Sequence, residues 1–439
     1  MTSRTIQGLS ERGTALAISG GIRDRFGSVL GDPFHAESNP KGFVNIGTSE
    51  SYTMLPEVTK FANERVRFEE RDFSYGDGPW GSERLRCAMA KHMNKHFQPV
   101  QPVDPSDILF SNGVTSLCEQ LGFSIAEAGD GIMFTRPIYQ AFRSDFGTRA
   151  KITPVWVSFR GDDQFTTSSI KHWEAAYDQA SKDGITIRAV MLCNPHNPLG
   201  RCYPKSLIIA LMEFCQKRKL HLLSDEIYAS SVYDVPSSDV PAVPFISVLS
   251  FDTTPYIDTQ YLHVLYGMSK DFASGGLRLG CIYTRNEHLF RAMGAMSQFH
   301  WLCNPAEKLA AVMLESEEWM EHFQALSRKR LAERNSLTRR LLDDLSIGYS
   351  AKSNAGFFIW ADLRRYLPSI ARDGRKICGW EAEEELMEML RENGVFMTPG
   401  NHLSADEPGF FRIIFSQEES VLKEGMRRVG ETIARIEKE

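Results

Sequence analysis

The amino-acid sequence predicts an α/β protein: a large domain with a mainly parallel mixed sheet, and a smaller α+β domain built from the two chain ends. Between about residues 107 and 285, short apolar runs repeatedly end in polar or glycine-rich turns, as buried strands do. Segments with helical periodicity, such as 204–217, separate several of these runs, and that alternation builds parallel βαβ units. The strand runs are DILFSNG, GIMFTRP, AVMLCNP, HLLSDE, HVLYGMS and LGCIYTR.

The change of pattern after Asn304-Pro305 predicts the second domain. A long helix is expected over 306–345, followed by strands in FFIWADL, GVFMTPG and FFRIIFS, with a helix in AEEELMEMLRENG between the first two. The loop 235–244, rich in proline and serine, is either a surface excursion or a lid. The expected division is an N-terminal segment of the small domain (1–61), the large domain (62–305), a bridging helix (306–345) and the small C-terminal domain (346–439).

Composition and charge exclude several classes of protein. The 439 residues include 50 Lys+Arg and 56 Asp+Glu, and no basic run is long enough to follow a phosphate backbone, so nucleic acid is not expected as a partner. No apolar run reaches membrane-spanning length, and the N-terminus lacks the apolar core of a secretion signal, so we expect a cytoplasmic protein without a membrane partner. The eight cysteines lie without paired short spacings, which predicts reduced thiols and no metal site.

Lys270 is the first candidate for chemistry. It follows the apolar run YLHVLYG and precedes the glycine-rich ASGGLRLG. Most lysines are solvated surface residues, but a lysine at the mouth of a buried strand is partly desolvated, which lowers its pKa and favours imine formation. Arg278, in the same run, can supply a planar cation for a phosphate.

Polar groups at three other strand ends can reach the same site. Asp225 ends HLLSD, and as a buried carboxylate it would need a cationic partner such as a protonated pyridine nitrogen; the alternative is an Asp that caps the next helix. Tyr228 follows in the same turn. The rigid loop CNPHNPLGR directs the Asn197 amide towards a ligand, and SNGVTSL begins a helix whose first amides, at Val114 and Thr115, can bind a phosphate.

These motifs resemble those of fold-type I pyridoxal-phosphate enzymes in the class I/II aminotransferase superfamily. NPHNPLG, SDEIY and SKDFASGGLRLG occur in the order of that superfamily and at close to its spacings, and the similarity runs from about Asn39 to the C-terminus. NPKGFVNIGTSES and SKDF resemble motifs of its 1-aminocyclopropane-1-carboxylate synthase-like branch. The resemblance implies an aminotransferase-type fold, pyridoxal 5'-phosphate bound by the large domain, and a homodimer with shared active sites.

The resemblance also implies a role for each matching residue. Lys270 would bind the cofactor as a Schiff base, Asp225 would bind its ring nitrogen, and Arg412 in FFRIIFS would bind the substrate α-carboxylate. Asn197 and Tyr228 would hold the phenolic oxygen of the ring. The remaining cofactor contacts would be Tyr139 on the ring face and, around the phosphate, Val114, Thr115, Ser269, Arg278 and Tyr75 of a second subunit.

Three stretches depart from the family pattern. Gly267 replaces a serine three residues before the lysine, which removes one phosphate hydroxyl. The stretch YGDGPWGSERLR, from Tyr75 to Arg86, is about two residues longer than its counterpart in the family. In GTSES, Glu50 matches a glutamate of the synthase pocket, which makes it a candidate substrate-binding residue, but Thr48, Ser49 and Ser51 replace Leu, Ala and Asn.

The expected reaction begins with an α-amino acid that forms an external aldimine and loses its Cα proton to Lys270. Departure of a sulfur group would then give a carbon–sulfur lyase acting on a sulfur-bearing amino acid or S-conjugate, which is the first hypothesis because of the synthase-like motifs. Transfer of the amino group to a keto acid would instead give an aminotransferase. A third alternative is a non-catalytic cofactor-binding regulator, although Lys270, Asp225 and Arg412 are all retained.

Overall fold

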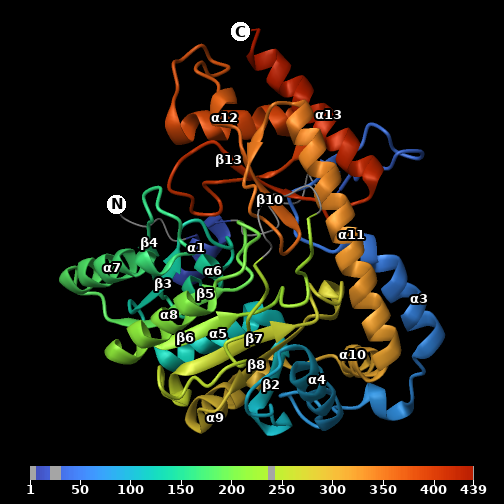
Figure 1. Cartoon of the computed structure of the whole chain (residues 1–439), viewed down its shortest axis with the longest axis vertical. Coiled ribbons are helices and arrows are strands. Elements are labelled where there is room, and N and C mark those ends of the chain that lie inside the picture. Colours follow the sequence, from blue (N-terminus) through green and yellow to red (C-terminus); the bar gives the residue numbers. More distant parts are fainter. Residues whose placement is uncertain (1–5, 20–30, 236–242, 439) are drawn as a thin grey trace.

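A seven-stranded mixed sheet forms the centre of the large domain (Figure 1). The structure is a computed structural model that describes residues 6–19, 31–235 and 243–438. The strand order is β2-β8-β7-β6-β5-β3-β4, and only β8 runs antiparallel to its neighbours. The predicted α/β class with a mainly parallel mixed sheet is therefore confirmed. The strands are β2 Ile108–Asn112, β3 Gly131–Thr135, β4 Thr153–Val157, β5 Ile187–Cys193, β6 His221–Asp225, β7 Leu262–Gly267 and β8 Leu279–Thr284.

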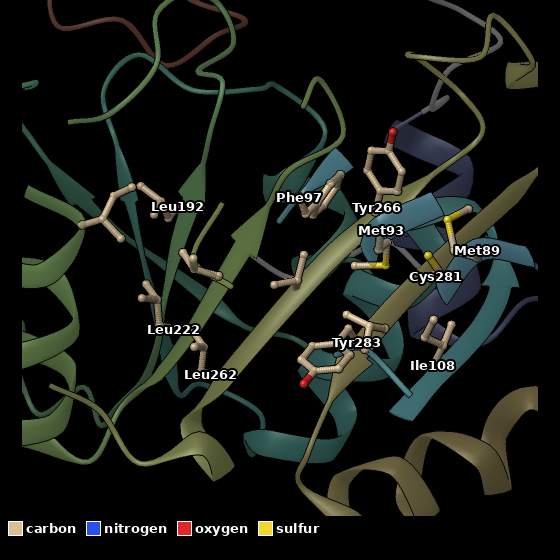
Figure 2. Packing of buried hydrophobic residues seen from close by; sticks show 14 of the residues in the cluster. Met89, Met93, Phe97, Ile108, Leu192, Leu222, Leu262, Tyr266, Cys281 and Tyr283 are labelled. Carbon is tan, nitrogen blue, oxygen red and sulfur yellow. The ribbon is translucent and has the colours of Figure 1, made fainter. Parts of the chain in front are cut away.

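Helices cover both faces of this sheet, because successive strand residues point to opposite sides. Leu222 belongs to one apolar core and Leu223 to the other. Figure 2 shows the first core, where Leu192, Leu222 and Leu262 lie on neighbouring strands and Met93 comes from α4. The helices on this face are α4 Glu83–His96, α7 Ile170–Lys182 and α8 Lys205–Arg218, and those on the other face are α5 Gly113–Ile125, α6 Phe142–Gly147 and α9 Glu287–Met296.

The small domain contains two further sheets. A four-stranded antiparallel sheet has the order β12-β13-β10-β9, and β1 pairs in parallel with β11. The run GVFMTPG, predicted as one strand, forms two: β11 pairs with the N-terminal β1, whereas β12 pairs with β13. The strands are β1 Val44–Asn45, β9 Gly348–Tyr349, β10 Phe358–Asp362, β11 Val395–Phe396, β12 Thr398–Pro399 and β13 Phe410–Ile414, and the helices are α12 Gly379–Glu392 and α13 Glu419–Ile436.

The predicted bridging helix is interrupted at Ser316. Its φ and ψ of -83° and 69° end α10 (Asn304–Glu315), and its carbonyl accepts a hydrogen bond from Met320 as α11 (Glu317–Asp344) begins. The Ser316 hydroxyl donates back to the carbonyl of Val312, 2.8 Å away, which offers the chain an alternative to a continuous helix. The single helix predicted over 306–345 is therefore wrong in this detail, and α11 alone makes the long connection (Figure 1).

Shorter elements complete the described chain. They are α1 Glu11–Ser19, α3 Leu55–Arg65, and 3-10 turns at Tyr52–Met54, Glu70–Phe73, Pro105–Asp107, Thr167–Ser169, Thr259–Tyr261, Gly275–Leu277, Ser297–His300 and Arg364–Tyr366. Residues 236–242 of the proline-rich loop lie outside the described part. In the three described stretches, no helix combines the length and the apolar character needed to cross a membrane. The domain limits given above remain a proposal.

Candidate active site

The predicted site residues come together at one edge of the large sheet. Asp225 is the last residue of β6, and Asn197 and Lys270 follow the parallel strands β5 and β7. Because β8 runs in the opposite direction, its first residues lie at the same edge, and Arg278 directly precedes it. The polar groups therefore lie at the carboxyl ends of the parallel strands, where open α/β sheets bind ligands.

Asp225 is a buried carboxylate without an ion-pair partner. Its side chain accepts one hydrogen bond, 3.2 Å long, from the main-chain N–H of Ile227. Asp225 is 5 % exposed, and no cation among the described residues forms an ion pair with it. Burial raises the pKa of this carboxyl from its usual 3.8 to about 7, while Ile227 and Lys270 oppose the rise. A cationic ring nitrogen would supply the missing partner.

Lys270 lies in a mixed electrostatic environment. Burial lowers the pKa of its amine from 10.5 to about 8, and the charge of Arg412 adds to that effect. Glu50 and Asp225 act in the opposite direction. The amine donates a hydrogen bond to the main-chain carbonyl of Ser49. A lysine with this pKa is partly neutral near pH 8, as nucleophilic and general-base chemistry requires.

Arg412 is held in place by hydrogen bonds but keeps one buried donor free. It is 2 % exposed and lies on β13 of the small domain. Its Nη1 donates to Asn197 Oδ1 at 2.9 Å, and its Nη2 donates to the Gly47 carbonyl at 2.9 Å. Its Nε has no hydrogen-bond partner among the described residues. A buried unpaired guanidinium N–H is costly, so this edge of Arg412 is suited to a carboxylate ligand.

Two tyrosines border the site. Tyr228 is buried, its phenolic oxygen lies 3.0 Å from the Ser49 hydroxyl, and burial raises its pKa. Two phenylalanines of the small domain, Phe357 and Phe358, make edge-on contacts with its ring at 5.3 and 5.2 Å. Tyr139 follows β3, and burial raises its pKa as well. Both residues therefore lie near the strand ends, as the sequence predicted.

The predicted phosphate site is a close contact between the start of α5 and the segment before β8. A Cβ on Gly280 would lie 2.5 Å from the amide nitrogen of Val114, and one on Gly113 would lie 2.7 Å from Nη2 of Arg278. The two glycines thus let a guanidinium and the first amides of a 13-residue helix converge. Thr115, in the first turn of α5, is exposed and hydrogen-bonds Asp145, a carboxyl whose pKa burial raises to about 7.

Gly267 differs from the family serine for a steric reason. A Cβ at this position would lie 2.6 Å from the Leu279 carbonyl oxygen and 2.8 Å from Cα of Gly280. A serine would therefore push β8 away from β7. Ser269, which follows β7 as well, remains in the sequence next to Lys270.

The structure does not bring Tyr75 to the rest of the site within one chain. Tyr75 is 82 % exposed, and its ring packs 5.3 Å from that of Trp301. Glu50, in contrast, is close enough to Lys270 to raise the pKa of its amine, and it hydrogen-bonds Tyr52. Glu50 thus places a carboxylate at the site, whereas Tyr75 is available to a second subunit.

Sequence reasoning assigned no role to two residues that organise the site. Asp271 accepts hydrogen bonds from the Ser230 amide, the Ser231 hydroxyl and the Tyr266 hydroxyl at 2.8, 2.6 and 2.9 Å. These bonds connect the loop after Asp225 to the segment that contains Lys270, and Figure 2 shows Tyr266 among the buried hydrophobic residues of the first core. Thr398 lies 3.3 Å from Nη2 of Arg412. An acid directly after Lys270 is a signal in the sequence, whereas Thr398 gives none.

The arrangement suits pyridoxal 5'-phosphate. The buried, unpaired carboxylate of Asp225 is available for a ring nitrogen, and the half-buried Lys270 can form an imine. The first amides of α5 and the guanidinium of Arg278 meet at two glycines, where they can bind a phosphate. Fold and site together define a pyridoxal-phosphate-dependent enzyme of fold type I.

Comparison with known proteins gives the family. Residues 41–429 match the class I and II aminotransferases. The chain is 31 % identical over 402 residues to 1-aminocyclopropane-1-carboxylate synthase 6 of Oryza sativa subsp. japonica, covering 88 % of this chain and 71 % of the relative. It is 27 % identical over 444 residues to the probable inactive 1-aminocyclopropane-1-carboxylate synthase-like protein 2 of Mus musculus, covering 98 % and 73 %. An aspartate aminotransferase double mutant from Thermus thermophilus has the same fold, with a TM-score of 0.72, 19 % identity and coverage of 97 % and 100 %.

The chain therefore belongs to the class I and II aminotransferase family. Within that family it resembles the 1-aminocyclopropane-1-carboxylate synthase-like branch.

Proposed function

We propose that the protein is a carbon–sulfur lyase that acts on a sulfur-bearing α-amino acid or S-conjugate. The observation that supports this choice is the Glu50 carboxylate beside Lys270, at the position where the synthase-like branch has a glutamate. A fixed carboxylate repels a second carboxylate on the substrate side chain, which disfavours aspartate-like substrates. It accepts a neutral or positively charged side chain. The similarity to a 1-aminocyclopropane-1-carboxylate synthase supports the same proposal.

Arg412 orients the substrate. Asn197 and the Gly47 carbonyl hold two of its nitrogens, so the guanidinium cannot rotate away, and its free Nε is available to the α-carboxylate. Such a fixed, charge-assisted contact aligns Cα with the amine of Lys270.

Lys270 removes the Cα proton at its Nζ. With its pKa lowered to about 8, about half of the free amine is neutral at pH 8 and able to accept a proton. Pyridoxal phosphate, when bound, supplies an electron-withdrawing ring that stabilises the negative charge left at Cα. Asp225 would hold the protonated ring nitrogen, Asn197 and Tyr228 would hold the phenolic oxygen, and Tyr139 would cover one face. The Val114 and Thr115 amides, the Thr115 hydroxyl, Ser269 and Arg278 would anchor the phosphate.

An aminotransferase is the second candidate, and the shared fold with an aspartate aminotransferase favours it. Both reactions use Lys270 for the first proton transfer. They differ in the next step: in an aminotransferase Lys270 would give up that proton again, whereas in a lyase a sulfur group would leave from the substrate side chain.

The test is to mix purified holoenzyme with methionine, S-substituted cysteines and aspartate, with and without 2-oxoglutarate. A lyase keeps the pyridoxal spectrum, turns over without a keto acid, and releases a thiol or thioether detectable by mass spectrometry. Full turnover only when the keto acid is present, with conversion to the pyridoxamine spectrum, would overturn the proposal. Glu50→Gln should lower lyase turnover. If the purified protein shows no pyridoxal absorbance that borohydride removes, the lyase proposal fails and a non-catalytic protein is favoured instead.

We further propose that the protein works as a homodimer in which Tyr75 of each subunit completes the phosphate site of its partner. Tyr75, Phe73 and Phe299 are 82 %, 72 % and 73 % exposed. Exposed large aromatic side chains are typical of protein–protein contacts.

A further inference from the structure

Ser49 contacts two residues of the proposed catalytic machinery at once. Its hydroxyl oxygen lies 3.0 Å from the phenolic oxygen of Tyr228, and its main-chain carbonyl accepts the hydrogen bond of the Lys270 amine. Ser49 is 9 % exposed. The synthase-like branch has an alanine here, so this hydroxyl is a feature of the present chain.

The main chain around Ser49 is held in place from both sides. The Asn45 side-chain oxygen accepts hydrogen bonds from the amides of Gly47 and Thr48, both at 3.1 Å. The Gly47 carbonyl accepts from Arg412 and from the Thr398 hydroxyl, at 2.9 and 3.0 Å. The segment that ends at Ser49 therefore has little freedom to move the hydroxyl away from Tyr228.

The hydrogen-bonding capacity of Tyr228 determines what Ser49 can do. A tyrosine hydroxyl has one hydrogen to donate and lone pairs that accept. When that hydrogen points to a phenolic oxygen of the cofactor, the Ser49 hydroxyl must be the donor towards Tyr228. A donated bond polarises the phenol and strengthens it as a donor in turn, because hydrogen bonds in a chain reinforce one another. The pKa of Tyr228 is consistent with this effect. Burial raises the pKa, and the hydrogen bond with Ser49 partly offsets that rise.

We propose that Ser49 is a positioning residue that directs the Tyr228 hydroxyl at the cofactor's phenolic oxygen and strengthens its hydrogen bond. The inference rests on the proposed role of Tyr228. A stronger bond to the phenolic oxygen stabilises its anion. In the holoenzyme, the phenolic oxygen and the nitrogen linked to Lys270 would share one proton. Because the hydrogen bond stabilises the phenolic anion, this proton is lost at a lower pH with Ser49 present than without it.

The test is a pH titration of the visible absorbance of the holoenzyme, which reports loss of this proton independently of turnover. Ser49→Ala should raise the transition by about 0.3–1 pH unit, the size of one ordinary hydrogen bond. Ser49→Thr, which keeps the hydroxyl, should restore the wild-type transition. Ser51→Ala is the matched control, because it removes the hydroxyl of another buried serine two residues away.

A double-mutant cycle distinguishes the role of Ser49 from that of Tyr228. In a Tyr228→Phe background, which should itself raise the transition, Ser49→Ala should have no further effect, because its partner hydroxyl is gone. If Tyr228→Phe shifts the transition but Ser49→Ala leaves it unchanged, lowers it, or adds fully to Tyr228→Phe, the role of Ser49 is wrong. An equal shift for Ser51→Ala would overturn that role as well. If Tyr228→Phe causes no shift, the proposed role of Tyr228 fails together with that of Ser49.

Discussion

The basicity of Lys270 depends on neighbours from distant parts of the sequence. Burial and Arg412 lower the pKa of its amine, whereas Glu50 and Asp225 raise it, and the balance leaves it at about 8. None of these three charged residues is adjacent to Lys270 in the chain. The residue type alone makes imine chemistry possible, and burial together with Arg412 lowers the pKa of the amine enough for it to react near neutral pH.

Lys270→Ala should effectively abolish turnover: we expect a reduction of at least about 10²-fold to 10⁴-fold, because no other base replaces the amine. The variant should still bind pyridoxal phosphate without a covalent link, through the contacts proposed for Asp225 and Arg278. Absorbance after dialysis measures the retained cofactor, and borohydride reduction followed by mass spectrometry measures covalent attachment. Cofactor that borohydride still fixes to the variant chain would show that another lysine forms the imine.

Asp225 makes the cofactor-free protein sensitive to pH. Its folded pKa of about 7 lies above the usual 3.8, so the folded state binds the proton more tightly than the unfolded state. Its contribution to stability is therefore present at low pH and is lost as the pH rises from about 4 to about 7. Asp225→Asn, whose amide oxygen can still accept from Ile227, should change the stability of the cofactor-free protein little near pH 4. At pH 8 it should add up to about 4 kcal/mol to the free energy of unfolding.

Denaturant unfolding of the cofactor-free protein at several pH values measures this effect. The holoenzyme is the internal control: with the ring nitrogen as the proposed cationic partner of the ionised carboxylate, the same substitution should weaken cofactor binding. A cofactor-free Asp225→Asn variant that is no more stable than wild type at pH 8 would contradict the prediction.

At the scale of the elements, the contact between α5 and β8 shapes the proposed phosphate site. A Cβ on Gly280 would lie within 2.5 and 2.6 Å of main-chain atoms of Val114 and Gly113, so one element would have to move. Gly280→Ala should lower the free energy of unfolding by about 1–3 kcal/mol, as overpacking does. It should also weaken cofactor binding, because the helix amides are displaced from Arg278.

Gly276→Ala is the matched control for this prediction. Gly276 lies in the same glycine-rich segment, and a Cβ there would have no heavy atom within 4 Å. Equilibrium dialysis gives cofactor affinity, and denaturant unfolding gives stability. Equal losses for the two variants would mean that the segment tolerates no side chain in general, which would contradict a specific contact at Gly280.

For the whole molecule, the exposed aromatic residues Phe73, Tyr75 and Phe299 are the basis of the proposed dimer. Phe299→Asp should shift the protein towards monomer, because it replaces an exposed aromatic side chain two positions before Trp301, which packs on Tyr75, with a charge. Sedimentation velocity measures the change, and cofactor affinity should fall with it, since Tyr75 no longer reaches a partner. Ile370→Asp is the control: Ile370 is 53 % exposed but lies before α12 in the small domain. A Phe299→Asp variant with the wild-type sedimentation coefficient would contradict the proposed surface.

The sequence by itself determined the class of the fold and the residues that follow its strands. Alternating strand and helix periodicity is a local property, so it predicted the parallel βαβ core. Asp225, Asn197 and Lys270 could be placed at one edge because parallel strands end together. Local patterns did not predict where an element is interrupted. The helical periodicity continues through Ser316, but the helix breaks there, and the run 394–400 forms two short strands that belong to different sheets.

Only the tertiary structure decided how distant segments complete the site. Arg412 lies 215 positions from Asn197, and Ser49 lies 179 positions from Tyr228, yet each pair is joined by a hydrogen bond. Such contacts depend on how the small domain and the N-terminal segment pack against the strand ends, and no periodicity encodes that packing. Burial then sets the pKa values of Asp225 and Lys270, because the loss of water around a charge is a property of the folded molecule and not of the residue.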